Sequence, residues 1–213
     1  NHVLPVLNQN NMQFYYAVDS DPFVYQLGGR YYNDDYTESA LDSAETYQGL
    51  KEMFELYTVY GVPVSANFFN RFRTGEIPMG IGNFSNYMQI RSAAPEIAGR
   101  WGIAVMPGHL REDGAVNHSQ GAAVAEAAMI MSQTEYPEDA WEFLKWWMSD
   151  DIQKQFGNEI EAQNGETARW NTANTAAFES MPWPQEDLRV IREALSQCDQ
   201  TEVVLGGYFS TRH

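Results

Sequence analysis

Cysteine is nearly absent from this sequence. Cys198 is the only cysteine among 213 residues, so no disulfide can form within the chain. Low cysteine usage fits the cytosol, and it fits equally well a large secreted protein that needs no covalent cross-link. The surrounding run LSQCDQ holds no histidine or basic residue that would activate the thiol, so we expect Cys198 to be structural rather than nucleophilic.

Basic side chains are scarce as well. The chain has 13 Lys and Arg residues against 29 Asp and Glu residues, which gives a formal net charge of −16 at pH 7. A field of this sign repels nucleic-acid phosphates and anionic lipids, so we expect no nucleic-acid partner. No apolar stretch reaches the roughly 18 residues of a membrane span, and no signal peptide or lipidation motif is present. We therefore expect no direct membrane insertion of this segment.

Catalytic and metal-binding motifs are also missing. The sequence has no G-x-S-x-G, no Walker loop and no H-E-x-x-H, and its four histidines are scattered without ligand spacing. A glycosidase needs two carboxylates in one cleft, but the candidate pairs lie in hydrophilic runs where a solvated face is expected. These pairs are Asp34 with Asp35, Asp150 with Asp151, and Glu159 with Glu161. The sequence therefore predicts neither an enzyme nor a metal or cofactor site.

Helical and strand patterns alternate along the chain, which predicts an α/β fold. The clearest helix runs over 42–61, where Asp42 and Glu45 resemble a capping box and Gly61 ends the pattern. Its expected buried stripe consists of Tyr47, Leu50, Phe54 and Tyr57. Pro137 predicts the first turn of another helix, whose broad apolar face comprises Ala140, Trp141, Leu144, Trp147 and Met148.

The remaining elements follow from the same patterns. Further helices are expected over 67–74, 83–94, 150–160 and 185–197. Alternating apolar residues predict strands over 77–81 and 101–105. An apolar run predicts another strand over 121–131, although its alanines leave a helix open there. The segment 109–120 is expected to be an exposed polar loop, and 203–209 an extended tail. No Pro/Gly/Ser-rich linker divides the chain, so we expect a single domain over 1–213.

Polar and aromatic residues gather where loops meet the predicted helices and strands. A junction after a strand directs side chains into a crevice at its carboxyl end. Flat aromatic rings cover the apolar C–H faces of a sugar, while amide and guanidinium groups bond its hydroxyls. A core role stays open for Phe84 and Trp170, and the pattern also fits other polar ligands. The candidate carbohydrate-binding residues are Asn83, Phe84, Tyr87, Gln120, Arg169, Trp170 and Tyr208.

Several segments resemble family 1 extracellular solute-binding proteins of bacterial ABC importers. MIMSQTEYPEDAWEFLKWWMSDDIQKQF is the most specific match, and FRTGEIPMGIGNFSNY and APEIAGRWGIAVMPG resemble the family's strands and following helix. FGNEIEAQNGETARWNTAN and LGGYFSTRH are similar to segments of its carbohydrate-importer branch. The resemblance covers 12–213. It implies a helix-rich fold around a small sheet, of periplasmic-binding-protein type II.

The resemblance also implies a function and a location. Such a protein captures a carbohydrate, often an oligosaccharide, between two lobes and delivers it to the membrane subunits of an ABC permease. It is usually a monomer that is periplasmic, or extracellular and anchored to the cell surface as a lipoprotein. Since no signal or lipobox is visible and the match starts near the family's second lobe, we expect a partial domain. The N-terminal lobe and the C-terminal end would then be missing.

Two alternatives stay open at this point. The chain could be a protein-interaction lobe without a ligand of its own, which an exposed apolar patch without a polar cleft would favour. It could also be a glycoside-active enzyme domain, which two suitably spaced carboxylates in one cleft would favour.

Overall fold

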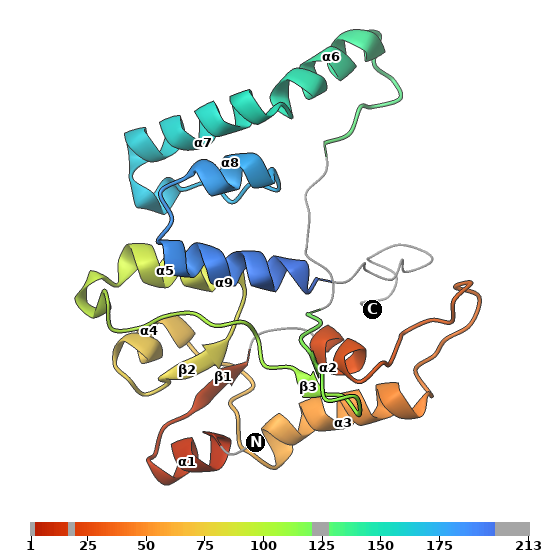
Figure 1. Ribbon diagram of the computed structural model, residues 1–213, viewed down its shortest axis with the longest axis vertical. Helices are drawn as coiled ribbons and strands as arrows, with labels where there is room; N and C mark the ends of the chain where they lie inside the picture. The colour runs from red at the N-terminus through yellow and green to blue at the C-terminus, as the bar shows by residue number, and fades with distance from the viewer. Residues whose placement is uncertain (1–2, 17–19, 121–127, 199–213) are drawn as a thin grey trace.

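The structure is a computed structural model that describes residues 3–16, 20–120 and 128–198. Its α-helices are α1 (Val3–Gln9), α2 (Asp21–Gln26), α3 (Ala44–Thr58), α4 (Phe68–Arg73), α5 (Phe84–Ala93), α6 (Pro137–Trp147), α7 (Asp150–Asn164), α8 (Thr175–Ser180) and α9 (Gln185–Ser196). The strands are β1 (Phe14–Tyr16), β2 (Met79–Ile81), β3 (His109–Leu110) and β4 (Val116–Asn117), with 3-10 turns at Pro95–Ile97 and Glu166–Ala168. The fold is the helix-rich α/β architecture that the sequence predicts (Figure 1).

Two small sheets hold the strands. β1 and β2 pair in parallel, with Phe14 opposite Met79 and Tyr16 opposite Ile81. The strand expected over 77–81 is therefore confirmed over its last three residues, 79–81. β3 and β4 form an antiparallel hairpin inside the segment that we expected to be only a loop. The strand expected over 101–105 is wrong, because this extended segment pairs with no strand among the described residues, although Trp101 and Ile103 pack against the core.

The buried face of helix α3 is not the face that its apolar pattern predicts. Its N-cap is Ser43, not Asp42, and the Ser43 hydroxyl accepts a hydrogen bond from the Thr46 backbone N–H. The expected stripe is wrong at Tyr47 and Phe54, whose side chains are 68% and 56% exposed. The fully buried residue is Thr46, whose hydroxyl bonds both the N–H and the carbonyl of Arg30 at 2.9 Å.

Small residues let α3 pack closely against α2. A Cβ atom built on Gly49 would lie 2.5 Å from the Phe23 carbonyl oxygen, so only glycine fits this contact. Tyr47 and Phe54 therefore face outward, whereas Leu56 and Tyr57 of α3 pack in the cluster that includes Phe23.

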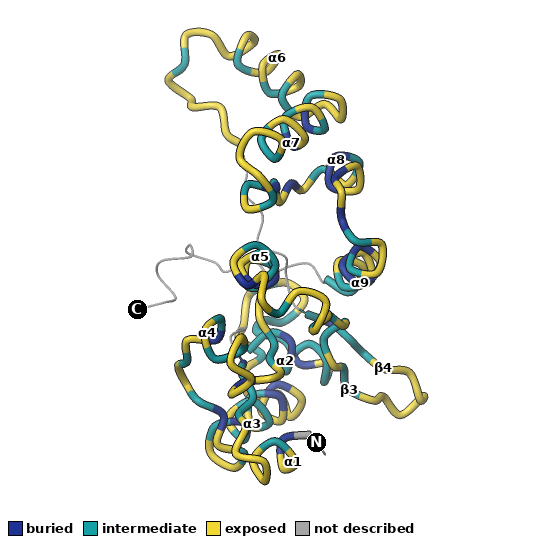
Figure 2. The backbone as a smooth tube through the Cα atoms, turned by 90° about the vertical axis from the view of Figure 1, so that its left-hand side faces the viewer, coloured by how far each residue is buried: buried dark blue, intermediate teal, exposed yellow. Residues whose placement is uncertain are grey.

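In the described part of the chain, buried apolar side chains form three clusters. Figure 2 shows where the buried residues lie along the backbone. One cluster joins α1, β1 and α3, and a second joins α4, the residues before β2, and α5. The third and most aromatic cluster lies between α5, α8 and α9, with Tyr87, Phe178 and Trp183 at its centre. Helix α5 contributes Ile90 to the second cluster and Tyr87 to the third, so it connects the two halves of the fold.

Other helical predictions agree with the structure to differing extents. The helices expected over 67–74, 83–94 and 185–197 are present as α4, α5 and α9, although Leu195 of α9 is exposed rather than buried. Helix α7 extends beyond 160 to Asn164, and α1, α2 and α8 were not predicted. Residues 121–127 of the strand expected over 121–131 lie outside the described residues, as does the tail over 203–209; 128–131 form no strand.

A matched pair of glycine substitutions tests the α2–α3 contact. In a helix interior, Gly→Ala normally adds about 1 kcal/mol to the free energy of unfolding. We expect Gly49→Ala instead to lower it by about 1–3 kcal/mol, because the new methyl group overpacks against backbone. Gly157→Ala on α7 meets only the flexible Met181 Cε atom, so it should keep or raise the stability. Urea unfolding of both variants measures the difference, and equal effects would contradict this account of the packing.

Candidate functional site

The carboxyl edge of the β1–β2 sheet is where polar side chains and helix starts meet. Because the two strands are parallel, their carboxyl ends, Tyr16 and Ile81, lie at the same edge, where α5 follows β2. Asn83 caps α5: its side chain accepts from the Asn86 backbone N–H, and the Asn86 side chain accepts from the Asn83 backbone N–H. This capping box orients the turn that carries the exposed Asn83 and the half-buried Phe84.

Phe84 forms the half-exposed edge of the aromatic cluster. Its ring centroid lies 5.4 Å from that of Tyr87, 5.8 Å from Trp183 and 6.0 Å from Phe178. These tilted and edge-on contacts are the arrangements that aromatic rings prefer. The Phe84 ring thus packs against three other aromatic rings, and the residue is only partly buried.

Arg169 lies behind this cluster and is engaged within the chain. Its guanidinium forms two hydrogen bonds with the Glu161 carboxylate and one of 3.2 Å with Glu166. It also stacks over the Trp183 ring, 4.7 Å from the ring centroid. The hydrogen bonds that Arg169 donates to Glu161 raise the pKa of Arg169 above its ordinary value, so the group is a permanent cation.

Tyr87 is buried and has a partner for its hydroxyl. The Tyr87 O–H donates to Asp187 at the start of α9 over 2.7 Å. Burial is the main cause that raises the pKa of Tyr87, and the hydrogen bond to the Asp187 carboxylate raises it further. Arg91 pairs with both Glu166 and Asp187, so the polar network closes around the outside of the aromatic cluster.

The other predicted residues lie at different places. Trp170 packs on the far side of the cluster, with its ring centroid 4.8 Å from Phe156 and 5.9 Å from Trp147. The Gln120 side-chain amide donates to the carbonyl of Ala194 near the end of α9, away from the α5 junction. Tyr208 lies outside the described residues. The structure thus brings Phe84, Tyr87, Arg169 and Trp170 into or against one cluster, with Asn83 at its rim.

Sequence reasoning missed a polar group at the start of α2. The Tyr31 hydroxyl donates to the Asp21 carboxylate at 2.7 Å and lies 2.8 Å from the Ser20 hydroxyl, where the chain enters α2. Burial, together with Asp21, raises the pKa of Tyr31. The hydroxyl of Ser119 is buried and has no hydrogen-bond partner among the described residues. No motif marks Ser20, Asp21 or Tyr31, whereas Ser119 belongs to the polar run HSQG that also contains the candidate Gln120.

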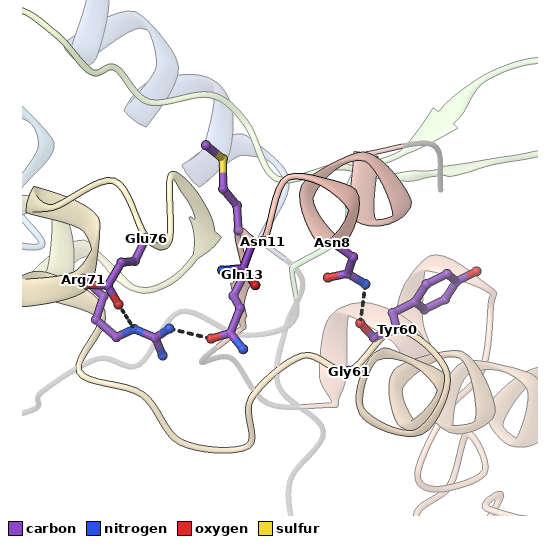
Figure 3. A pocket seen from close by; sticks show the side chains of 8 residues that line it. Asn8, Asn11, Gln13, Tyr60, Gly61, Arg71 and Glu76 are labelled. Carbon is purple, nitrogen blue, oxygen red and sulfur yellow. Dashed lines mark hydrogen bonds and ion pairs between the residues drawn. The ribbon is translucent and has the colours of Figure 1, made fainter.

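A separate hollow of about 600 Å³ opens at the opposite edge of the sheet (Figure 3). Its lining includes Asn8, Gln13, Tyr60, Arg71 and Glu76. Many of its polar groups bond each other, because Arg71 donates to both Glu76 and Gln13, and the Asn8 amide donates to the Tyr60 carbonyl. In open α/β sheets ligands bind at the carboxyl ends of strands, so the geometry favours the Asn83–Phe84 edge over this hollow.

The described residues show neither a metal-binding cluster nor a membrane-spanning helix. Among them, no three His, Cys, Asp or Glu side chains are grouped so that they could hold a metal ion. None of the described helices combines the length and apolarity needed to cross a bilayer.

Residues 7–182 match the sequence profile of bacterial extracellular solute-binding proteins. The chain belongs to this family. The match covers most of the chain, including the β2–α5 junction and the α6–α7 pair. The family consists of binding proteins rather than enzymes. Comparison with curated proteins found no match.

Solved structures of the same fold come from sugar-binding ABC transporter proteins. An ABC transporter solute-binding protein from Thermotoga lettingae bound with α-D-tagatose has a TM-score of 0.58 and 23% identity, covering 90% of this chain and 49% of its own. An ABC substrate-binding protein from Listeria monocytogenes in complex with cycloalternan has a TM-score of 0.60 and 16% identity, covering 92% and 50%. The sugar-binding protein MalE from Xanthomonas citri has a TM-score of 0.62 and 16% identity, covering 96% and 52%. The chain therefore spans about half the length of these proteins.

Removing Arg169 tests whether its charge supports the cluster. The Arg169 side chain is only 4% exposed, and Arg169→Met leaves the Glu161 carboxylate without its partner. Breaking one side of a buried ion pair costs about 3–5 kcal/mol, which we expect in urea unfolding. Adding Glu161→Gln should restore much of the loss, because the unpaired charge is gone. Arg189→Met, which breaks only exposed pairs on α9, is the control and should leave stability unchanged. If Arg169→Met were as stable as the native protein, the ion pair would not support the cluster, and a role of the native guanidinium in ligand binding would be favoured instead.

Proposed function

We propose that this chain forms one lobe of a carbohydrate-binding receptor that supplies an ABC permease. The observation that carries the proposal is the solute-binding family match over 7–182, which includes the capped β2–α5 junction with Asn83 and Phe84. The solved proteins of the same fold include two with bound sugars and one described as sugar-binding. Such a receptor works at the bacterial cell surface, anchored as a lipoprotein, or in the periplasm, and it acts as a monomer.

The sugar lies against the carboxyl edge of the sheet in this proposal. The accessible side of Phe84 covers an apolar C–H face of the sugar, and the Asn83 amide bonds its hydroxyls. Ser20 and Asp21 at the start of α2 are proposed to add further hydrogen-bonding groups. Tyr87 and Arg169 contribute indirectly, because their partners inside the chain hold the rings of Phe84 and Trp183 in place. Direct contacts of Gln120, Trp170 and Tyr208 with the sugar stay a prediction.

Capture is completed by a second lobe. Periplasmic binding proteins close around their ligands by hinge motion, so contacts on both lobes stabilise the closed form. A dissociation constant of 1 μM corresponds to about −8 kcal/mol, and 1 mM to about −4 kcal/mol. In this proposal the chain contacts the sugar from one side only and does not enclose it. We therefore expect the 213-residue chain to bind sugars in the millimolar range or more weakly.

Weak binding of this kind is measurable by NMR. We expect tens of millimolar maltose, D-tagatose or cycloalternan to shift the backbone amide signals of Asn83 and Phe84 in the 213-residue chain. Phe84→Ala should abolish the shifts, since it removes the accessible ring. Tyr47→Ala is the matched control, because this exposed ring on α3 lies outside the proposed wall.

Three outcomes would count against the proposal. If no sugar shifts the amide signals of Asn83 and Phe84, sugars do not bind at the carboxyl edge of the β1–β2 sheet. Micromolar binding by the 213-residue chain in calorimetry would show that one lobe suffices, contrary to the two-lobe mechanism. Turnover of a chromogenic glycoside would favour the enzyme alternative.

A further inference from the structure

The hollow at the other edge of the β1–β2 sheet lies where three helices end (Figure 3). Helix α1 is followed by Asn11 and α3 by Gly61, which both line the hollow and have left-handed backbone conformations with φ of 56° and 67°. Helix α4 is followed in the same way by Gly75, with φ of 79°, directly before the lining residue Glu76. A left-handed residue after a helix turns the chain back beside the last carbonyl groups of that helix. The hollow is therefore surrounded by the carbonyl ends of α1, α3 and α4.

Three amide side chains line this hollow, which we therefore call the amide hollow: Asn8, Asn11 and Gln13. The Asn8 amide donates to the Tyr60 carbonyl, and the Gln13 side-chain oxygen accepts from Arg71. The NH₂ group of Gln13 and the exposed side chain of Asn11 form no hydrogen bond with any described residue. Because an amide has both donors and an acceptor, these groups can bond a ligand that offers either.

Arg71 presents part of its guanidinium to the same space. Its Nε donates to Glu76 at 3.1 Å, and its Nη2 donates to the Gln13 side-chain oxygen at 2.6 Å. A guanidinium has five N–H donors, so the Nη1 group of Arg71 is without a partner in the described part of the chain. The Arg71 side chain is 32% exposed, so these remaining donors are accessible to a ligand.

The charges at the amide hollow disfavour ions of either sign. Arg71 and Glu76 neutralise each other as an ion pair. A free anion would meet Glu76 and the negative ends of three helix dipoles, within a chain of net charge −16. A free cation would meet Arg71, which already occupies the position beside Glu76. The groups that remain available are amides, carbonyl oxygens and guanidinium N–H donors, and together they match a neutral molecule rich in hydroxyl groups.

The size of the amide hollow suits a small ligand of this class. Its volume of about 600 Å³ lies within the range of about 300–1,000 Å³ that is typical of small-molecule sites. Met12, which is 38% exposed, also lines it and offers an adaptable apolar side chain to C–H groups.

We propose that the amide hollow is a second binding site for a neutral sugar or polyol, separate from the wall at Asn83 and Phe84. All of its lining residues lie between 8 and 76. The site is thus formed by this chain alone, and it depends neither on a second lobe nor on the receptor function proposed above.

NMR titration tests the site through its own side-chain amide signals. D-Glucose, D-glucuronate and D-glucosamine in its ammonium form share one ring and differ in charge. We expect D-glucose to shift the side-chain NH₂ signals of Asn11 and Gln13 in the 213-residue chain, with saturation in the millimolar range. The two charged sugars should bind at least about threefold more weakly, because neither charge finds an unpaired counter-charge.

A matched pair of substitutions separates the Asn11 amide from its backbone. Asn11→Gly keeps the left-handed conformation, which glycine adopts readily, and removes only the side chain. We expect D-glucose to bind about fivefold more weakly to this variant, the effect of one net hydrogen bond. Tyr36→Gly is the control, because Tyr36 has a similar φ of 58° but does not line the hollow, and it should leave the binding unchanged.

Four results would overturn the proposal. Tighter binding of D-glucuronate would assign the hollow to an anion at Arg71, and tighter binding of D-glucosamine would assign it to a cation at Glu76. Shifts that grow without saturation, or equal binding by Asn11→Gly and the native chain, would show that no specific site exists. Phe84→Ala should leave the Asn11 and Gln13 shifts unchanged, so failure of the receptor function is distinguishable from failure of this site.

Discussion

The contact between Arg169, Glu161 and Trp183 is the constraint on which the proposed ligand wall, the sheet edge with Asn83 and Phe84, depends. A buried guanidinium needs a charged partner, and Arg169 finds one in Glu161 on α7 while its plane stacks on Trp183. Trp183 lies just before α9 and contacts Phe84 at the start of α5. One buried ion pair therefore fixes α7 against the chain entering α9, and through Trp183 it sets the position of the half-exposed ring at the sheet edge.

The candidate site combines local features, which the sequence predicts, with tertiary contacts, which it does not. The Asn83 cap and the strand–helix turn are local signals, so the β2–α5 junction follows directly from the residues in NFSNY. The partners of Tyr87 and Arg169 are tertiary: Tyr87 bonds Asp187, 100 positions along the chain. Residue types indicated an aromatic and polar cluster correctly. They could not show that Tyr87 and Arg169 have partners inside the chain, or that Gln120 bonds the end of α9.

In the fold, too, local patterns predicted the helices, whereas tertiary packing could not be predicted from the sequence. Periodicity predicted helix α3, but close packing against α2 selected Thr46 and Gly49 for the buried face and left Tyr47 and Phe54 outside. Alternation in 101–105 predicted a strand, and a strand also needs a neighbour to accept its hydrogen bonds. The single parallel pair, β1 with β2, provides none for this segment among the described residues, so it stays extended and contributes Trp101 and Ile103 to the core.

The net charge of the protein and the charges near the proposed ligand wall favour the same class of ligand. A protein with a net charge of −16 repels anionic solutes, whereas a neutral polyol is indifferent to this field. The wall follows the same logic, because Arg169 is neutralised by Glu161 and Glu166 and does not offer a free cation to an anion. What remains accessible at the edge is an aromatic ring, an amide and hydroxyl or carboxylate acceptors. This combination matches an uncharged molecule that has both C–H faces and hydroxyl groups, and it matches an anion poorly.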